Sequence, residues 1–190
     1  DLYHLNEGHA AFLGLERLRN YLKNKHLPYD AALEIVRATQ LFTTHTPVPA
    51  GHDAFSEALL RDYLFEFTFA LDISWEELLA FGRLDANNPN ELFSVSNLAL
   101  RTSQEVNGVS RLHGQVSQKM FNELYPDYHY AESHVGYVTN GVHFPTWVAR
   151  EWLELYTETF GKGFLEDQTS KKYWEKIQKV PADKITGIRL

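Results

Sequence analysis

The chain has 190 residues, enough for one domain with its own core and too few to suggest two of ordinary size. An apolar fraction of 44% without a membrane-length apolar run predicts a soluble globular protein, and a net charge of -7 argues against nucleic acid or an anionic membrane as partner. Cysteine is absent, which excludes a disulfide framework and thiolate chemistry and fits the reducing cytoplasm.

The first part of the chain predicts two strands joined by helices. A short apolar strand at 1–5 turns through Glu7 into a helix whose leucines recur at helical spacing. Asp30 is expected to cap a second helix over 31–40, which leads directly into a strand at 41–45. This order is typical of the βαβ units of parallel sheets.

Helices dominate the middle of the chain. Asp53 is expected to cap a helix over 54–67. Ser74 and Glu77 form a capping box, the clearest helix start in the sequence. The pattern therefore predicts a long helical connection between two strands of the sheet.

The last part of the chain predicts two more strands. A strand-to-helix step is expected over 105–126 and a buried strand over 135–139. Pro145 suits the first turn of a helix over 145–156. The first residue is not a methionine, and Asp183 is typical of the cap of a helix that continues beyond the last residue. We therefore expect a segment of a longer protein.

Four segments share one pattern, in which a short apolar strand is followed at once by small polar residues. They are "HLNEGH", "TTHTPVPAGH", "VNGVSRLH" and "VTNGVH". In an open parallel sheet the loops beyond the carboxyl ends of the strands gather at one edge, where ligands bind. The side chains expected to converge in one crevice there are those of Asn6, Glu7, His9, His45, Thr46, Asn107, His113, Asn140 and His143.

Such a set suits the hydroxyl groups of a sugar. It offers neutral donors and acceptors with one carboxylate and no concentration of basic residues, and aromatic rings elsewhere could cover the apolar face of a sugar ring. For any single position the alternative is a turn-forming Asn-Gly or a loop histidine with a structural partner. The repetition over four loops weighs against that alternative.

A metal site is the rival interpretation. His4 and His9 are five residues apart, about 140° around a helix, so they do not share a face. A site built from His45 and His52 stays open, and it would make the protein a metal-dependent hydrolase. The sequence has no glycine-rich phosphate loop and no nucleophile elbow.

In the order and spacing of "HLNEGHAAF", "TTHTPVPAGHD", "VNGVSRLHG" and "TNGVHFPTW", the sequence resembles the glycogen and α-glucan (maltodextrin) phosphorylase family, most closely its bacterial branch. The resemblance covers the entire chain. It implies an α/β fold, in which a Rossmann-like parallel sheet segment with helix-rich surroundings is part of a two-domain glycosyltransferase fold. Residues 1–160 would be part of the N-terminal domain, and residues 161–190 a linker and helix leading toward the C-terminal domain.

The resemblance also implies roles at the reacting sugar. His45 matches the histidine whose backbone carbonyl contacts the reacting glucose, and Thr46 lies beside it. Asn140 matches the asparagine that binds the sugar's 6-hydroxyl, and Val109 matches an apolar wall of the same pocket.

Four further positions are implied nearby. Glu7, an aspartate in the animal enzymes, and His9 match positions nearer the glucan acceptor. Asn107 and His113 match a strand-to-helix turn that supports the pocket. The loop after Thr46 departs from the animal sequences, so roles are carried over only as far as Thr46 in that loop.

The family's reaction is phosphorolysis of a terminal α-1,4-glucosidic bond, which gives glucose 1-phosphate, with pyridoxal phosphate on a lysine of the C-terminal domain. That lysine and the basic residues that hold phosphate have no counterpart in this sequence, so the cofactor is expected outside the segment, and the segment alone is expected to be inactive. The implied partners are an α-1,4-glucan or maltooligosaccharide, phosphate, glucose 1-phosphate and the C-terminal domain, and a homo-oligomer stays open. The alternative from another class is a non-catalytic carbohydrate-binding or structural module.

Overall fold

A computed structural model describes residues 1–189 of the chain. By internal contacts these residues form two compact units, Asp1–Asn140 and a unit that begins at Gly141. The predicted boundary near residue 160 refers to the domains of a longer protein and stays a prediction. None of the helices described in residues 1–189 combines the length and the apolar character that crossing a membrane requires.

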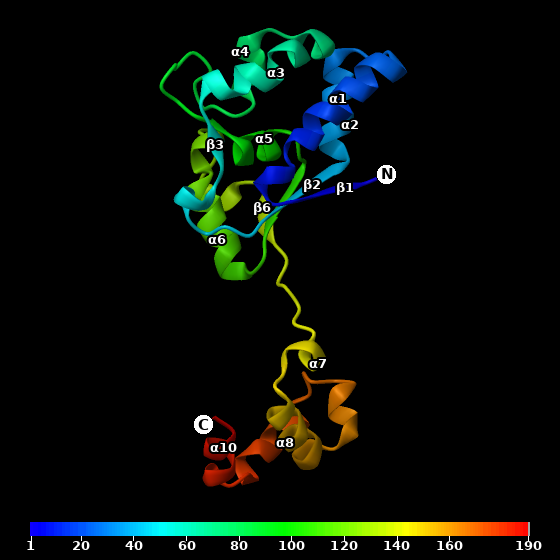
Figure 1. The fold of residues 1–190 in the computed structure, drawn as a ribbon, viewed down its shortest axis with the longest axis vertical. Coiled ribbons are helices and arrows are strands. Elements are labelled where there is room, and N and C mark those ends of the chain that lie inside the picture. The colour runs from blue at the N-terminus through cyan, green and yellow to red at the C-terminus, as the bar shows by residue number, and fades with distance from the viewer. Residues whose placement is uncertain (190) are drawn as a thin grey trace. The chain divides into compact units, whose positions relative to one another are not determined.

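The first unit contains a parallel sheet and its connecting helices (Figure 1). Its strands are β1 (Tyr3–Asn6), β2 (Gln40–Thr44), β3 (Ala54–Phe55), β4 (Phe93–Ser94), β5 (Glu105–Gly108) and β6 (Val135–Tyr137). Its α-helices are α1 (Phe12–Lys25), α2 (Tyr29–Ala38), α3 (Glu57–Leu71), α4 (Trp75–Ala80), α5 (Val95–Arg101) and α6 (Arg111–Met120). Short 3-10 helices are η1 (Gly8–Ala10), η2 (Pro49–Gly51), η3 (Asn122–Leu124) and η4 (Tyr130–Glu132).

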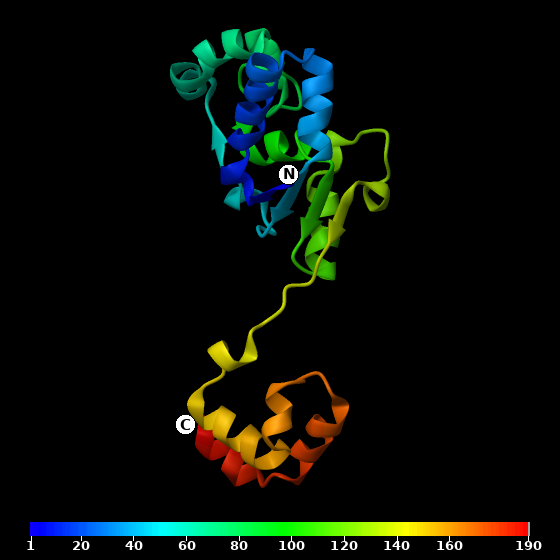
Figure 2. The same ribbon diagram turned by 90° about the vertical axis from the view of Figure 1, so that its right-hand side faces the viewer.

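Four strands pair in parallel in the order β1-β2-β5-β6, side by side in Figure 2. The predicted α/β class with a parallel sheet is therefore confirmed. Of the helices between these strands, α6 packs against β5 and β6, and α1 packs against α2 and α5. Helix α3 packs on α1 and α4, farther from the sheet (Figure 1).

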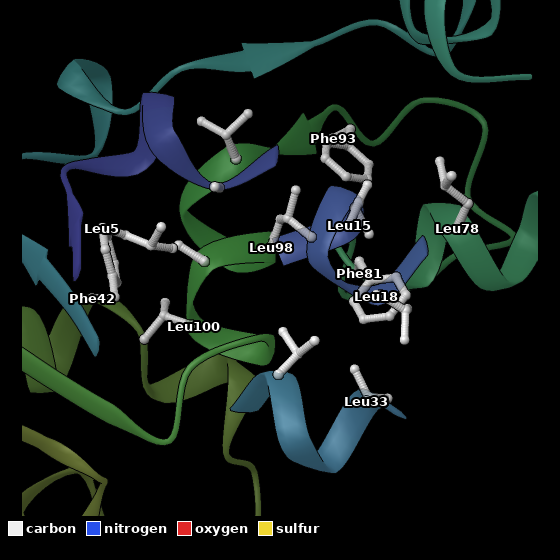
Figure 3. Packing of buried hydrophobic residues seen from close by; sticks show 14 of the residues in the cluster. Leu5, Leu15, Leu18, Leu33, Phe42, Leu78, Phe81, Phe93, Leu98 and Leu100 are labelled. Carbon is white, nitrogen blue, oxygen red and sulfur yellow. The ribbon is translucent and has the colours of Figure 1, made fainter. Parts of the chain in front are cut away.

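The core lies between the sheet and the helices that pack on it. Leu5, Phe42, Val106 and Val135 are register partners in one row across the four strands and are at most 3% exposed. Figure 3 shows Leu5 and Phe42 beside the leucines of α5. On the other face of the sheet, a hollow of about 470 Å³ is lined by residues that include His4, Leu41, Asn107 and Gly136.

The capping box predicted at Ser74 and Glu77 is confirmed. The Ser74 hydroxyl accepts from the Glu77 N–H at 3.1 Å, and the Glu77 carboxylate accepts from the Ser74 N–H at 2.7 Å. Three other predicted caps, at Asp30, Asp53 and Asp183, are wrong. Helix α2 begins after Pro28, so Asp30 lies inside its first turn, where its charge still favours the helix dipole.

Asp53 does not cap α3, because the chain stays extended after it. Residues Ala54 and Phe55 form β3, which pairs antiparallel with β4, so the helix cannot begin before Ser56. The Ser56 hydroxyl is the cap and accepts from the Leu59 N–H at 3.4 Å.

The second unit is helical. It contains α7 (Phe144–Trp147), α8 (Arg150–Phe160), η5 (Lys162–Leu165), α9 (Lys171–Trp174), η6 (Glu175–Lys179) and α10 (Ala182–Arg189). Stacked and edge-on rings of Tyr156, Phe160 and Phe164 hold it together. The single helix predicted over 145–156 is divided, because Val148 and Ala149 adopt extended backbone. Asp183 lies in the first turn of α10 rather than at its cap.

One buried cation fixes the amino ends of the first two strands. Arg17 of α1 is 6% exposed and donates to the Val36 carbonyl at 3.1 Å and to Gln40 Oε1 at 3.0 Å. Its guanidinium lies 3.8 Å from the centre of the Tyr3 ring. Helix α1 is thereby joined to the start of both β1 and β2.

We expect Arg17→Met to lower the free energy of unfolding by about 2–3 kcal/mol, because it leaves buried oxygen acceptors without their charged donor. Urea unfolding of the 190-residue chain measures the loss. The matched control is Arg19→Met on the exposed side of the same helix, where the pair with Glu16 is open to solvent, and its effect should be small. Equal losses for the two variants would contradict a bracing role for Arg17.

Candidate functional site

The four polar segments identified in the sequence begin at one edge of the sheet, and the fourth belongs to this unit only as far as Asn140. Parallel pairing aligns Asn6 with Thr43, Thr43 with Asn107, and Asn107 with Gly136. The four strands therefore end side by side, and the chain leaves all of them in the same direction. The structure thus brings the starts of these segments to one edge, whereas His143 of the fourth segment lies in the second unit.

Glu7 connects the segment after β1 to the segment after β2. One carboxylate oxygen, Oε2, accepts from the His45 backbone N–H at 2.7 Å and from the Thr46 hydroxyl at 2.9 Å. The other oxygen accepts from the Gly8 N–H at 3.1 Å and from the Thr44 hydroxyl at 3.4 Å. The predicted pair His45 and Thr46 thus rests on a side chain from the neighbouring strand.

The hydrogen bonds to Glu7 favour its charged form. Burial, the strongest single influence, raises the pKa of this half-buried carboxyl. The donors from His45, Thr46 and Gly8, together with the nearby His52, outweigh burial and hold the pKa below its ordinary value of 4.5. The contact is therefore made by a carboxylate rather than by a neutral acid.

Two histidine side chains complete this turn. The His45 ring nitrogen Nε2 lies 2.6 Å from Asn6 Oδ1, so it donates to that carbonyl oxygen. His52 donates from Nε2 to the Thr46 carbonyl at 3.2 Å, and its Nδ1 lies 2.7 Å from the Ser96 hydroxyl. From the sequence, His52 is a candidate metal ligand together with His45. No spacing in the sequence indicates its contact with Ser96 of α5, because 44 residues separate the two.

A polar row crosses the sheet just before this edge. His4 Nε2 lies 2.7 Å from the Thr43 hydroxyl, and Thr43 donates to Asn107 Oδ1 at 2.9 Å. The Asn107 amide donates in turn to the Gly108 carbonyl at 3.1 Å. Asn107 is buried, so the supporting role expected for it fits its position. Alternation along each strand indicates which face of the sheet His4 and Thr43 share. That the two side chains meet depends on the register of β1 against β2, which the sequence does not show.

The segments after β5 and β6 are joined through backbone atoms. The Asn140 N–H donates to the Val109 carbonyl at 3.0 Å. The Val109 N–H donates to His113 Nδ1 at 3.2 Å, which leaves the ring proton on Nε2, buried and without a partner among the described residues. This close packing requires glycine, since a Cβ on Gly108 would lie 2.8 Å from the Gly114 nitrogen.

Three of the residues expected at this edge are exposed to solvent. His45 and Asn140 are exposed at the edge, and so is His9 on η1. His143 belongs to the second compact unit, where its Nδ1 lies 2.6 Å from the Thr146 hydroxyl. The hollow on the polar face of the sheet includes His4, Asn107 and Val138 of these segments, but none of the cavities described within residues 1–189 is lined by Glu7, His45, Thr46 or Asn140, so these four residues lie at an open edge and not in a closed crevice.

The histidines of this edge do not form a metal centre in the structure. Within residues 1–189, no group of three or more His, Asp or Glu side chains is placed to hold a metal ion. His52 has both ring nitrogens within hydrogen-bonding distance of protein atoms, and His45 uses Nε2 in the same way. The arrangement supplies a fixed backbone turn and exposed neutral groups, which suit a polar uncharged ligand.

The lowered pKa of Glu7 predicts how the turn responds to acid. Because the folded pKa lies below the unfolded value of 4.5, the carboxylate stabilises the turn at every pH above 4.5, and this stabilisation is lost as pH falls through the folded pKa. The chemical shift of the His45 amide, followed by NMR in the 190-residue chain, should titrate with a midpoint below 4.5. Glu7→Gln should abolish that titration, and a midpoint above 4.5 would contradict the assignment.

Comparison with known proteins identifies the family. The carbohydrate phosphorylase family model matches residues 2–185. The chain is 38% identical to a glycogen phosphorylase of Mycobacterium tuberculosis over 195 aligned positions, which cover 100% of this chain and 22% of the relative. It is 36% identical to a maltodextrin phosphorylase of Thermococcus litoralis, with 96% of this chain and 21% of the relative covered. It is 35% identical to a glycogen phosphorylase of Aquifex aeolicus, with 96% and 26% covered. The chain therefore spans about a fifth to a quarter of the length of these relatives, and it belongs to the carbohydrate phosphorylase family.

Proposed function

We propose that this chain is a segment of an α-glucan phosphorylase, which cleaves terminal α-1,4-glucosidic bonds with phosphate and releases glucose 1-phosphate. Its family and the names of its relatives support this reaction class. The observation that carries the assignment to this edge of the sheet is the turn at His45 and Thr46, held by Glu7 and His52.

The His45 carbonyl is the proposed contact to the reacting sugar. Within residues 1–189 no hydrogen bond to this oxygen is present, while the N–H of the same residue is anchored on Glu7. A fixed carbonyl dipole at this point would stabilise positive charge as the glycosidic bond opens. Thr46 is proposed to act beside it, with its hydroxyl directed to Glu7.

Asn140 and Val109 are the proposed contacts on the other side of the sugar. Their backbones are hydrogen-bonded to each other, so an amide that could bind the 6-hydroxyl stays next to an apolar wall. His9 is proposed to lie nearer the glucan acceptor, and its exposed position on η1 is compatible with that role. His113 and Asn107 are proposed as supports, in line with their burial and hydrogen bonds.

The edge described here suits a sugar better than the family's cofactor. Its donors are amides, imidazoles and hydroxyls, and the four polar segments contain no lysine to which pyridoxal phosphate could be attached. We propose that the cofactor is held elsewhere in the longer protein, where its phosphate group would supply the proton together with the substrate phosphate. The residues of this chain bind and orient the glucan end.

The proposed partners follow from this reaction. They are an α-1,4-glucan or maltooligosaccharide, phosphate and glucose 1-phosphate, without nucleic acid or membrane. We further propose that residues 161–190 lead toward a C-terminal domain and that the protein works in the cytoplasm. Assembly into a homo-oligomer stays open.

The second candidate is a carbohydrate-binding module without catalysis. The absence of lysine from the four polar segments favours it, because binding a sugar needs no phosphate group. The metal-dependent hydrolase is not proposed, because His52 is bonded to Ser96 and to the Thr46 carbonyl.

We expect the 190-residue chain to release no glucose 1-phosphate from maltooligosaccharide, phosphate and pyridoxal phosphate, and the longer protein that contains it to do so. An enzyme-coupled assay of glucose 1-phosphate measures both. An inactive longer protein that still binds maltooligosaccharide would favour the binding module. Turnover by the purified chain would contradict the proposal that phosphate and cofactor bind elsewhere.

We expect Asn140→Ala in the longer protein to lower kcat/KM about tenfold, the effect of one lost hydrogen bond to the sugar. The synthetic direction provides the test, with glucose 1-phosphate and its 6-deoxy analogue as donors. The kcat/KM of the wild type should fall about tenfold when the analogue replaces glucose 1-phosphate. The kcat/KM of the variant should change little between the two donors, because its hydrogen bond to the 6-hydroxyl is already missing. Asn20→Ala, on the exposed face of α1, is the matched control. Independent, multiplicative losses would show that Asn140 does not read the 6-hydroxyl.

A further inference from the structure

The backbone at Glu7 adopts a conformation that residues with a side chain rarely take. Its φ is 72° and its ψ is 165°, a region occupied almost only by glycine. Gly8 follows immediately, yet the unusual angles fall on the glutamate. A strained residue persists only where its surroundings over-determine it, so the side chain of Glu7 must gain enough contacts to hold this backbone.

Those contacts occupy the carboxylate fully. Each oxygen accepts from one backbone N–H and one hydroxyl, Oε1 from Gly8 and Thr44, and Oε2 from His45 and Thr46. An ionised carboxylate offers about four acceptor sites, so none is left for a sugar hydroxyl. Glu7 therefore faces the protein.

We propose that Glu7 is a positioning residue, whose carboxylate holds the backbone of His45 and Thr46 in the place from which the His45 carbonyl meets the reacting sugar. This inference rests on the proposed function and replaces direct sugar binding by Glu7. The positive φ of Glu7 follows from this contact. These backbone angles direct the side chain of a residue that follows β1 toward the end of β2.

Glutamate is the residue type that this arrangement requires. A glutamine of the same length keeps only one acceptor oxygen, so it can serve Gly8 and Thr44 or His45 and Thr46, but not both pairs. Glycine would adopt the backbone angles without strain and would lose every contact. The two substitutions therefore separate the carboxylate from the backbone conformation.

The test uses Glu7→Gln and Glu7→Gly in the longer protein, with kcat and KM for maltooligosaccharide and hydrogen exchange of the peptide that contains His45 and Thr46. We expect both variants to lower kcat, on the order of 100-fold, with a much smaller change in KM. Exchange in this peptide should become faster in both. The control Glu76→Gln, in the exposed first turn of α4, should change neither quantity.

Thr46→Val provides a second measurement if either variant folds poorly. It removes one of the two donors to Oε2 and leaves the carboxylate on the His45 N–H. We expect an intermediate loss of kcat and, combined with Glu7→Gln, a total loss smaller than the product of the two single losses, because both act on the same contact.

Two outcomes would overturn the positioning role of Glu7, and a third would reject the proposed function alone. A raised KM with unchanged kcat and unchanged exchange would overturn the inference, since it would show that Glu7 binds the sugar in the ground state. Retained kcat in Glu7→Gly would overturn it as well. A wild type without phosphorolysis, in which Glu7→Gln still accelerates exchange at His45, would support the positioning contact and reject the proposed function.

Discussion

Parallel pairing of four strands in their chain order is the constraint on which the rest of the structure depends. It sets Asn6, Thr43 and Asn107 in one row and sends the chain out of every strand in the same direction. Helices pack on the apolar face of the sheet, where Leu5 and Phe42 are fully buried. Polar residues then collect at the carboxyl edge because each strand ends there, although they are far apart in sequence.

The edge is organised more through the backbone than through free side chains. At the turn of His45 and Thr46, Glu7 accepts from the His45 N–H and His52 donates to the Thr46 carbonyl. The Val109 carbonyl holds the segment after β6 through the Asn140 N–H. Groups fixed in this way need little reorganisation when a ligand arrives, which suits recognition by a carbonyl dipole better than by a flexible charge. The strain at Glu7 is the local cost of joining two strand ends with one side chain.

Much of the fold could be predicted from the sequence, because strands and helix starts are indicated by residues close together in the chain. The short apolar runs followed by polar loops predict the strands and the edge at which they end, and the capping box at Ser74 predicts one helix start. The resemblance to phosphorylases is confirmed by the family match over residues 2–185. The roles carried over to individual residues stay predictions.

The features that could not be predicted depend on contacts between distant residues. Asp53 and Ser56 are both good caps, and only the pairing of β3 with β4 decides between them. The buried Arg17 sits at a position where a helix pattern gives no reason for a core cation. Glu7 belongs to a tight turn in the sequence, but its four donors come from two segments that only the sheet brings together.

We propose that this sheet edge is one wall of a glucan site whose geometry is set by Glu7. A crystal structure of the longer protein with maltooligosaccharide bound would test this most directly. We expect a sugar ring next to the His45 carbonyl and the Asn140 amide, with both Glu7 oxygens still bonded to the protein. A sugar bound away from this edge, or a Glu7 carboxylate released from the His45 N–H and bonded to the sugar, would contradict it.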